Sequence, residues 1–141
     1  MKPAMPSWRI FCRRRIRCKK FLLSPAARRF EPELILVSAG YDGHWKDMLA
    51  SMQLTTTGFA RLAGVLKRLA GELCQGKIVF ALEGGYHLPA LATSVRATLE
   101  VLLGNQDIPD PIGPPPQDRQ PANISGIVKA VREAHGLATS W

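Results

Sequence analysis

Two short polar segments of this 141-residue chain carry the side chains most capable of chemistry. The first, Tyr41–His44, follows the apolar run Leu34–Val37, and the second, Glu83–Tyr86, follows the apolar run Ile78–Leu82. A predicted helix separates the two segments. Ligands of open α/β sheets bind in the crevice outside the carboxyl ends of the strands. We therefore expect a single site that is assembled from both segments.

The first segment offers a carboxylate, Asp42, with His44 and Asp47 close by in the chain. A carboxylate at the end of a buried strand can ligate a divalent metal, orient a histidine or cap a turn, and the spacing alone leaves all three alternatives open. His44 by itself is more typical of a surface or supporting group than of a ligand. Asp47 is expected to stabilise the loop.

The second segment offers a phenol, Tyr86, directly after Gly84 and Gly85. Two glycines permit a close backbone approach and unusual dihedral angles. A phenol in such a position can donate a hydrogen bond to a developing oxyanion, and the alternative is a tyrosine packed at the rim of the sheet. We expect the neighbouring His87 to be exposed to solvent rather than catalytic.

The surrounding pattern predicts the elements that position these residues. Continuous apolar runs are typical of strands buried on both faces of a parallel sheet. One helix is predicted to begin at Thr55–Thr57 and to stop at Gly76, and another to run from Pro89 to Gly104. The order predicts an α/β fold with a partial open parallel sheet (βαβα) and right-handed crossovers.

The composition divides the chain into three parts. Residues 1–20 form a basic leader that we expect to be disordered, and residues 21–106 form the α/β part. Residues 107–141 form an irregular, Pro-rich extended segment followed by a short terminal helix. That helix is predicted at about residues 124–134, and it could dock through Ile127, Val128 and Val131.

The net charge of +8 is confined to the amino-terminal region. Residues 1–29 hold ten of the nineteen Lys and Arg residues and no Asp or Glu, so the remaining 112 residues carry a net charge of −2. The leader could be a polybasic binding patch or an Arg-rich transit peptide, but the interpretation that we favour is a disordered tail or residues that are not native to the ancestral protein. A near-neutral body argues against a nucleic-acid-binding protein.

The cysteines and the hydropathy pattern give information on the cellular compartment of the protein. Cys12, Cys18 and Cys74 are odd in number and lack metal-binding spacing, which favours a reducing compartment, and we expect a cytoplasmic protein. No stretch reaches the ~18 apolar residues of a membrane span.

Three ordered blocks, Leu34–His44, Leu54–Phe59 and Leu82–Tyr86, closely resemble the zinc-dependent histone deacetylase superfamily. The resemblance is to bacterial and class II-like members, including acetoin-utilisation and acetylpolyamine amidohydrolase proteins. It covers the chain from about Leu22 to Gly104. It implies a sheet of the arginase/deacetylase type and a substrate that is an acetylated lysine or another acetylated amine.

The resemblance also implies residue roles. Asp42 matches a zinc-ligating aspartate, and Tyr86 matches the tyrosine that polarises the acetyl carbonyl and stabilises the tetrahedral intermediate. Gly84 and Gly85 match the glycine loop that lines the acyl-lysine tunnel, and His44 and Asp47 become candidate supporting residues. In such enzymes a zinc-bound water attacks the carbonyl, and a histidine pair handles the protons.

The chain departs from the family pattern in two ways. Met48 replaces a usual proline, which removes no chemistry. The family's other zinc ligands and its tandem histidines come from segments upstream of the match, and the residues before Leu34 contain no histidine and no aspartate. We therefore expect the carboxyl-terminal part of a deacetylase that is inactive as an isolated chain.

Two other interpretations remain open. The chain could be an interaction protein without catalysis that retains half of the deacetylase fold, and an exposed sheet edge could then cause self-association. The weakest alternative is a nucleic-acid-binding protein that uses its basic tail.

Overall fold

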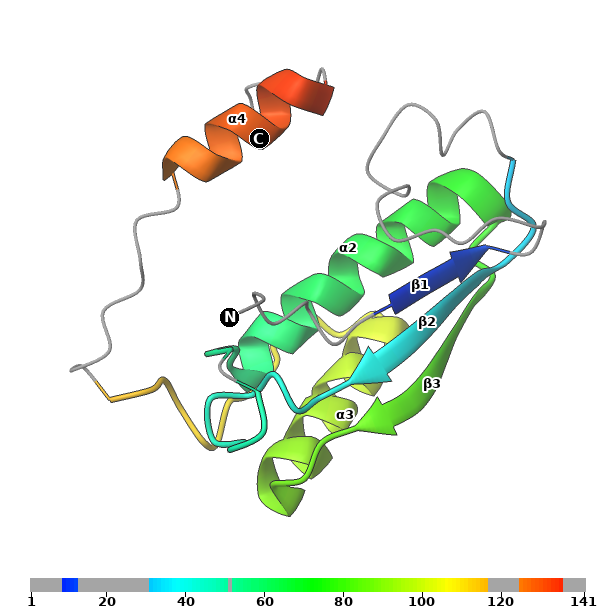
Figure 1. Cartoon of the computed structure of the whole chain (residues 1–141). Coiled ribbons are helices and arrows are strands. Elements are labelled where there is room, and N and C mark those ends of the chain that lie inside the picture. Colours follow the sequence, from blue (N-terminus) through cyan, green and yellow to red (C-terminus); the bar gives the residue numbers. More distant parts are fainter. Residues whose placement is uncertain (1–8, 13–30, 51, 117–124, 136–141) are drawn as a thin grey trace.

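The structure, a computed structural model, describes residues 9–12, 31–50, 52–116 and 125–135 (Figure 1). The elements in chain order are β1 (Arg9–Cys12), β2 (Ile35–Gly40), α2 (Thr56–Cys74), β3 (Ile78–Gly84), α3 (Leu88–Leu103) and α4 (Ser125–His135). The predicted strand–helix–strand–helix order is confirmed for residues 35–103. The fold is α/β, as expected.

The sheet has three strands in the order β1-β2-β3. Strands β2 and β3 pair in parallel, from Ile35 opposite Ile78 to Ala39 opposite Leu82, and the register shifts between Ala39 and Gly40. Strand β1 pairs with β2 in the antiparallel direction. It lies within residues 1–20, the leader for which the sequence predicts disorder, and the rest of that leader lies outside the described residues. The β-branched Ile10 and the aromatic Phe11 favour a strand at this position.

Helix α2 begins and ends where the sequence predicts. The Thr55 hydroxyl accepts a hydrogen bond from the Gly58 amide at 3.1 Å and caps the first turn. At the other end Gln75 and Gly76 both have positive φ angles, +56° and +81°, which turn the chain directly into β3. The crossover from β2 to β3 therefore needs only a short connection.

The hydrophobic core lies between the sheet and helices α2 and α3, which cover the same face of the sheet (Figure 1). Its fully buried members include Ile35 and Val37 of β2 and Phe59 of α2. Because side chains alternate along a strand, Leu36 points to the opposite face, where it is 37% exposed. The helices thus cover one face of the sheet more completely than the other.

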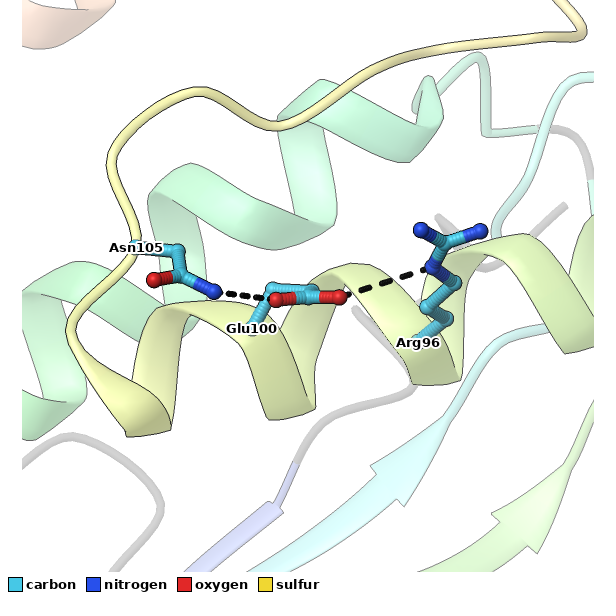
Figure 2. Close-up of polar contacts among 3 residues, drawn as sticks. All are labelled: Arg96, Glu100 and Asn105. Atoms are coloured by element: carbon cyan, nitrogen blue, oxygen red, sulfur yellow. Dashed lines mark hydrogen bonds and ion pairs between the residues drawn. The ribbon is translucent and has the colours of Figure 1, made fainter.

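A polar bridge links α3 to the segment that follows it (Figure 2). The Glu100 carboxylate lies 3.5 Å from Arg96 Nε, one turn earlier, and it accepts a hydrogen bond from the Asn105 side-chain amide. Gly104, with φ of +104°, ends the helix. An ion pair this exposed contributes little to stability, so the bridge mainly fixes the direction in which the Pro-rich segment leaves α3.

The terminal helix α4 runs over Ser125–His135, close to the residues 124–134 expected from the sequence, and the suggested docking of its apolar residues remains a prediction. Figure 1 shows α4 apart from the sheet and its helices, and Ile127, Val128 and Val131 are 65%, 40% and 49% exposed. These three residues give the helix an apolar stripe, and that stripe alone does not specify which surface it meets. Within the described ranges, no helix combines the length and the apolar character required to cross a membrane.

Candidate functional site

Asp42 lies directly beyond the carboxyl end of β2, beside the carboxyl end of β3. The Tyr41 amide donates a hydrogen bond to the Gly84 carbonyl at 2.8 Å, which joins the two strand ends. A Cβ atom on Gly84 would lie 3.3 Å from Asp42 Oδ1. The absence of a side chain at Gly84 therefore lets β3 approach the Asp42 carboxylate. The two predicted polar segments do meet at one end of the sheet.

Gly85 is required by the backbone and by its neighbours. Its φ of +132° lies in a region that side chains disfavour, and a Cβ atom there would lie 2.8 Å from Leu91 Cδ1 and 3.2 Å from Tyr41 Cβ. This packing explains the second glycine of the pair. The predicted contact of Gly84 and Gly85 with substrate remains a prediction.

The Asp47 carboxylate connects the two loops. Oδ2 accepts hydrogen bonds from the Tyr86 amide at 2.7 Å and from the His87 amide at 3.1 Å, and Oδ1 accepts one from the Leu49 amide at 3.1 Å. Burial raises the pKa of this carboxyl, but the three amide donors outweigh burial, and the net pKa is lowered. Asp47 is thus an ionised clamp that fixes the backbone of Tyr86 relative to the Asp42 loop.

Tyr86 lies between β3 and α3, with its backbone held by Asp47 and its side chain 65% exposed. The phenol therefore projects into solvent from a fixed attachment point. The next residue, His87, caps α3, because its Nδ1 accepts a hydrogen bond from the Ala90 amide at 3.2 Å. Sequence reasoning missed this role. The signal was a polar residue two positions before Pro89, at the start of a helix.

His44 is fully buried, whereas its type and spacing suggested a surface or supporting group. Its ring stacks on Phe59 with a centroid distance of 6.4 Å. Nδ1 accepts a hydrogen bond from the Lys46 amide at 3.2 Å, and Nε2 lies 3.5 Å from Thr56 Oγ1. Burial lowers the pKa of His44, and the nearby Asp110 opposes this shift. His44 is therefore a neutral side chain that supports the loop from within the core.

A further carboxylate, Asp110, secures the Pro-rich segment against the same loop. Its Oδ1 accepts a hydrogen bond from the Gly113 amide at 2.9 Å, and its Oδ2 accepts one from the Thr57 amide in the first turn of α2 at 3.4 Å. The Trp45 indole N–H donates to the Gly113 carbonyl at 2.9 Å. The composition of the Pro-rich segment does not indicate where the segment docks, so the sequence does not predict these contacts.

A catalytic zinc normally has three protein ligands. In the part of the chain that the structure describes, no group of three His, Cys, Asp or Glu side chains could hold a metal ion. Asp42 offers a carboxylate whose role as a metal ligand remains a prediction, while Asp47 and His44 are committed to the contacts above. The described residues therefore do not make a complete zinc site.

The comparisons with known proteins identify the family. Residues 15–102 match the family model described as the histone deacetylase domain. The chain belongs to the histone deacetylase family. The predicted resemblance is thereby confirmed.

Individual relatives agree with this assignment. The chain is 49% identical over 87 residues to histone deacetylase 14, chloroplastic, of Arabidopsis thaliana, and the match covers 62% of this chain and 21% of that protein. It is 49% identical over 84 residues to the human polyamine deacetylase HDAC10, covering 60% and 12%. The chain thus spans about a fifth or less of these relatives. A crystal structure described as the HDA15 HD domain aligns with a TM-score of 0.49 at 36% identity, covering 58% of this chain and 22% of that one.

Proposed function

We propose that residues 31–104 form one wall of a deacetylase site whose substrate is an acetylated lysine or another acetylated amine. The observation that carries this proposal is the Asp47 clamp, with Tyr86 N lying 2.7 Å from Asp47 Oδ2. The clamp ties the loop that follows Asp42, a metal-ligand candidate, to the backbone of Tyr86, a hydroxyl donor. Membership of the histone deacetylase family and the names of the relatives support the substrate class.

The proposed role of Tyr86 is to donate a hydrogen bond from its phenol to the acetyl oxygen as that oxygen becomes negative. Such a donor contributes most when it is already oriented before the reaction, because no energy is then needed to align it. The amide of Tyr86 is fixed by Asp47, and the residue is 65% exposed, which leaves its phenol accessible. The proposed role of Asp42 is to supply one carboxylate ligand to a divalent metal.

Because the described residues supply a single candidate ligand, we propose that the 141-residue chain alone does not hydrolyse acetylated amines. Equilibrium dialysis against zinc, followed by an assay with an acetyl-lysine peptide and an acetylated polyamine, tests this. We expect less than one zinc ion per chain and no turnover above a zinc-only blank. Turnover that is lost in Tyr86→Phe would contradict the proposal.

A chimera tests the residue roles separately from the activity of the isolated chain. The 87-residue stretch of Arabidopsis histone deacetylase 14 that matches this chain would be replaced by the matching stretch of this chain. We expect a chimera that deacetylates, and Tyr86→Phe within it should lower kcat by roughly 100-fold or more, as loss of one oxyanion donor does elsewhere. Leu103→Gln, an exposed change on α3, is the matched control. A folded but inactive chimera would show that this segment does not serve the proposed role.

A second candidate function is that of an interaction protein without catalysis. It is favoured by the large apolar side chains that remain exposed along β3 and α3. Urea unfolding distinguishes this candidate, because a stable scaffold unfolds in one cooperative transition, whereas an incomplete domain does not.

A cytoplasmic location is also proposed, on the basis of the reduced-cysteine pattern. Two relatives are named as chloroplastic, so fractionation of the cell is the direct test.

A further inference from the structure

His44, Thr56 and Thr93 form a hydrogen-bond network, which we call the inner network, and its direction is fixed at His44. The Lys46 amide donates to His44 Nδ1 at 3.2 Å, and a backbone N–H can only donate, so Nδ1 carries no proton. An imidazole with an unprotonated Nδ1 bears its proton on Nε2. Nε2 of this fully buried ring is therefore a donor, and Thr56 Oγ1 lies 3.5 Å from it.

The inner network continues from Thr56 into α3. Thr56 is also fully buried, and Thr93 Oγ1 on α3 lies 3.3 Å from its hydroxyl. The Thr93 hydroxyl lies 3.0 Å and 3.1 Å from the carbonyls of Pro89 and Ala90, which can only accept. Each proton has an acceptor if His44 donates to Thr56, Thr56 to Thr93, and Thr93 to these carbonyls, as buried polar groups require. The opposite direction would leave both nitrogens of His44 without a proton and make the ring an anion.

The carbonyls at the end of the inner network belong to the turn that follows Tyr86. In that turn the Leu91 amide donates to the His87 carbonyl at 2.9 Å, and the Ala90 amide donates to His87 Nδ1 at 3.2 Å. His87 directly follows Tyr86 in the chain. A hydrogen bond to the carbonyls of Pro89 and Ala90 therefore also restrains the backbone from which the Tyr86 side chain projects.

The loop after β2 thus holds this turn in two places. Asp47 accepts from the two amides that precede α3, and the inner network, which begins at His44, donates to two carbonyls inside its first turn. One attachment fixes a position but lets the helix pivot about it, whereas two attachments also fix its orientation. We propose that Thr56 and Thr93 are positioning residues, which orient Tyr86 by linking the first turn of α3 to the buried imidazole.

The catalytic value of this orientation rests on the proposed role of Tyr86. A phenol that donates to an oxyanion contributes most when its direction is set before the reaction. Nuclear magnetic resonance (NMR) detects the inner network without zinc and without an acetylated substrate. A missing inner network would leave the Tyr86 role untouched, and a Tyr86 that takes no part in catalysis would leave the inner network untouched.

The tautomer of His44 is the first test. Nitrogen-15 NMR of the full 141-residue chain at neutral pH distinguishes the tautomers, because protonated and unprotonated ring nitrogens differ widely in chemical shift. The signals of the other two histidines are identified by their loss in His87→Asn and His135→Gln, so that those of His44 remain. We expect the proton on Nε2. A proton on Nδ1, or on both nitrogens, would overturn the proposal.

Hydrogen exchange of individual amides tests the other end of the inner network. Thr93→Val keeps the shape of the side chain but loses the hydroxyl. The Ala90 and Leu91 amides should then exchange about fivefold faster, the factor that corresponds to one net hydrogen bond. Thr93→Ser keeps the hydroxyl and should restore the wild-type rate. Thr56→Val and Thr56→Ser should give the same pair of results at Leu91, because Thr56 is the middle member.

Thr98→Val is the matched control on the same helix. The Thr98 hydroxyl also donates to a carbonyl one turn earlier, that of Ser94 at 3.0 Å, and it accepts from Tyr41 at 3.0 Å. Its loss should not accelerate exchange at Leu91 more than in the rest of α3. Equal acceleration along the whole helix in Thr93→Val, acceleration that Thr93→Ser fails to reverse, or a wild-type Leu91 amide without protection would each overturn the proposal.

Discussion

The carboxyl ends of β2 and β3 and the outer edge of β3 contrast in how their groups are satisfied. At the strand ends, buried polar groups find partners within the chain. Asp47 accepts three amide hydrogen bonds, and His44 and Asp110 are similarly occupied. At the outer edge of β3 Leu82 is 60% exposed, and on α3 Leu103 is 80% exposed. The loops of the candidate site are complete in themselves, whereas the edge requires cover from another surface.

This contrast separates two kinds of information in the sequence. The geometry of the candidate site comes from short loops that are anchored on one buried core, so a chain spanning a fifth of its relatives retains it. Cover for the outer edge of β3 is not supplied by the described residues. Changes at the strand ends should therefore reduce stability, and changes at the edge should alter association with little effect on stability.

The largest effect is expected from Phe59→Ala. The Phe59 ring is fully buried and contacts both Tyr41, at a centroid distance of 5.1 Å, and His44. Its truncation should lower the free energy of unfolding by about 3–5 kcal/mol, since a large cavity opens below the loop. Urea denaturation measures the loss, and Leu62→Ala, 40% exposed on the same helix, is the control. Equal losses of unfolding free energy in the two variants would contradict the expectation that the buried Phe59 ring contributes more to stability than a partly exposed residue of the same helix.

A smaller effect with a characteristic pH dependence is expected from Asp47→Asn. The variant should be about 1–3 kcal/mol less stable at pH 7, because amide donors lose a charged acceptor. The pKa of Asp47 is lowered in the folded chain, so its contribution is present above pH ~4, the unfolded value, and is lost as pH falls through the folded pKa. The difference in unfolding free energy between wild type and Asp47→Asn should therefore become smaller as the pH falls.

Urea denaturation at a series of pH values between 7 and 3 measures this gap, and the exposed change Asp107→Asn is the control. The lowered pKa of His44 adds a separate loss of stability as pH falls below ~6.5, and this loss is slightly larger in the variant, because the Asp47 charge partly opposes the lowering in wild type. A gap that stayed constant with pH would mean that the charge of Asp47 is not what holds Tyr86.

The smallest effect on stability is expected at the edge, from Leu103→Gln. This side chain is 80% exposed, so the free energy of unfolding should change by less than about 0.5 kcal/mol. Solubility, measured by ammonium sulfate precipitation, should nevertheless rise, because the apolar surface shrinks. The exposed Leu88, at the start of α3, gives a control in Leu88→Gln. A large loss of stability in Leu103→Gln would contradict the expectation that the exposed apolar residues contribute less to stability than the residues at the strand ends.

The sequence predicted the elements of the α/β part well, because each had local signals. The cap at Thr55 and the glycines at 76 and 104 marked the helix ends, and uninterrupted apolar runs marked β2 and β3. The position of Asp42 beside Gly84 also followed from parallel pairing. These features depend on residues that are close together in the chain or on one simple rule of sheet geometry.

The features that were missed depend on distant contacts. The clamp of Asp47 on Tyr86 joins residues 39 apart, and the bond from Thr57 to Asp110 joins residues 53 apart. The burial of His44 likewise depends on its contacts with Phe59 and Thr56. The hydrophobic periodicity of the sequence does not indicate that these residues meet His44. A short polar side chain in a loop has many possible partners, and sequence spacing does not choose among them.

The hydrogen bond between Trp45 and Gly113 has a consequence for the time course of synthesis. It closes over 68 residues, so at about 5–20 residues per second Gly113 is made several seconds after Trp45. Throughout that interval β2, α2 and β3 can begin to fold on the ribosome, but the loop that carries Asp42 lacks its cover. The loop that carries Asp42 is therefore completed only when Gly113 has emerged.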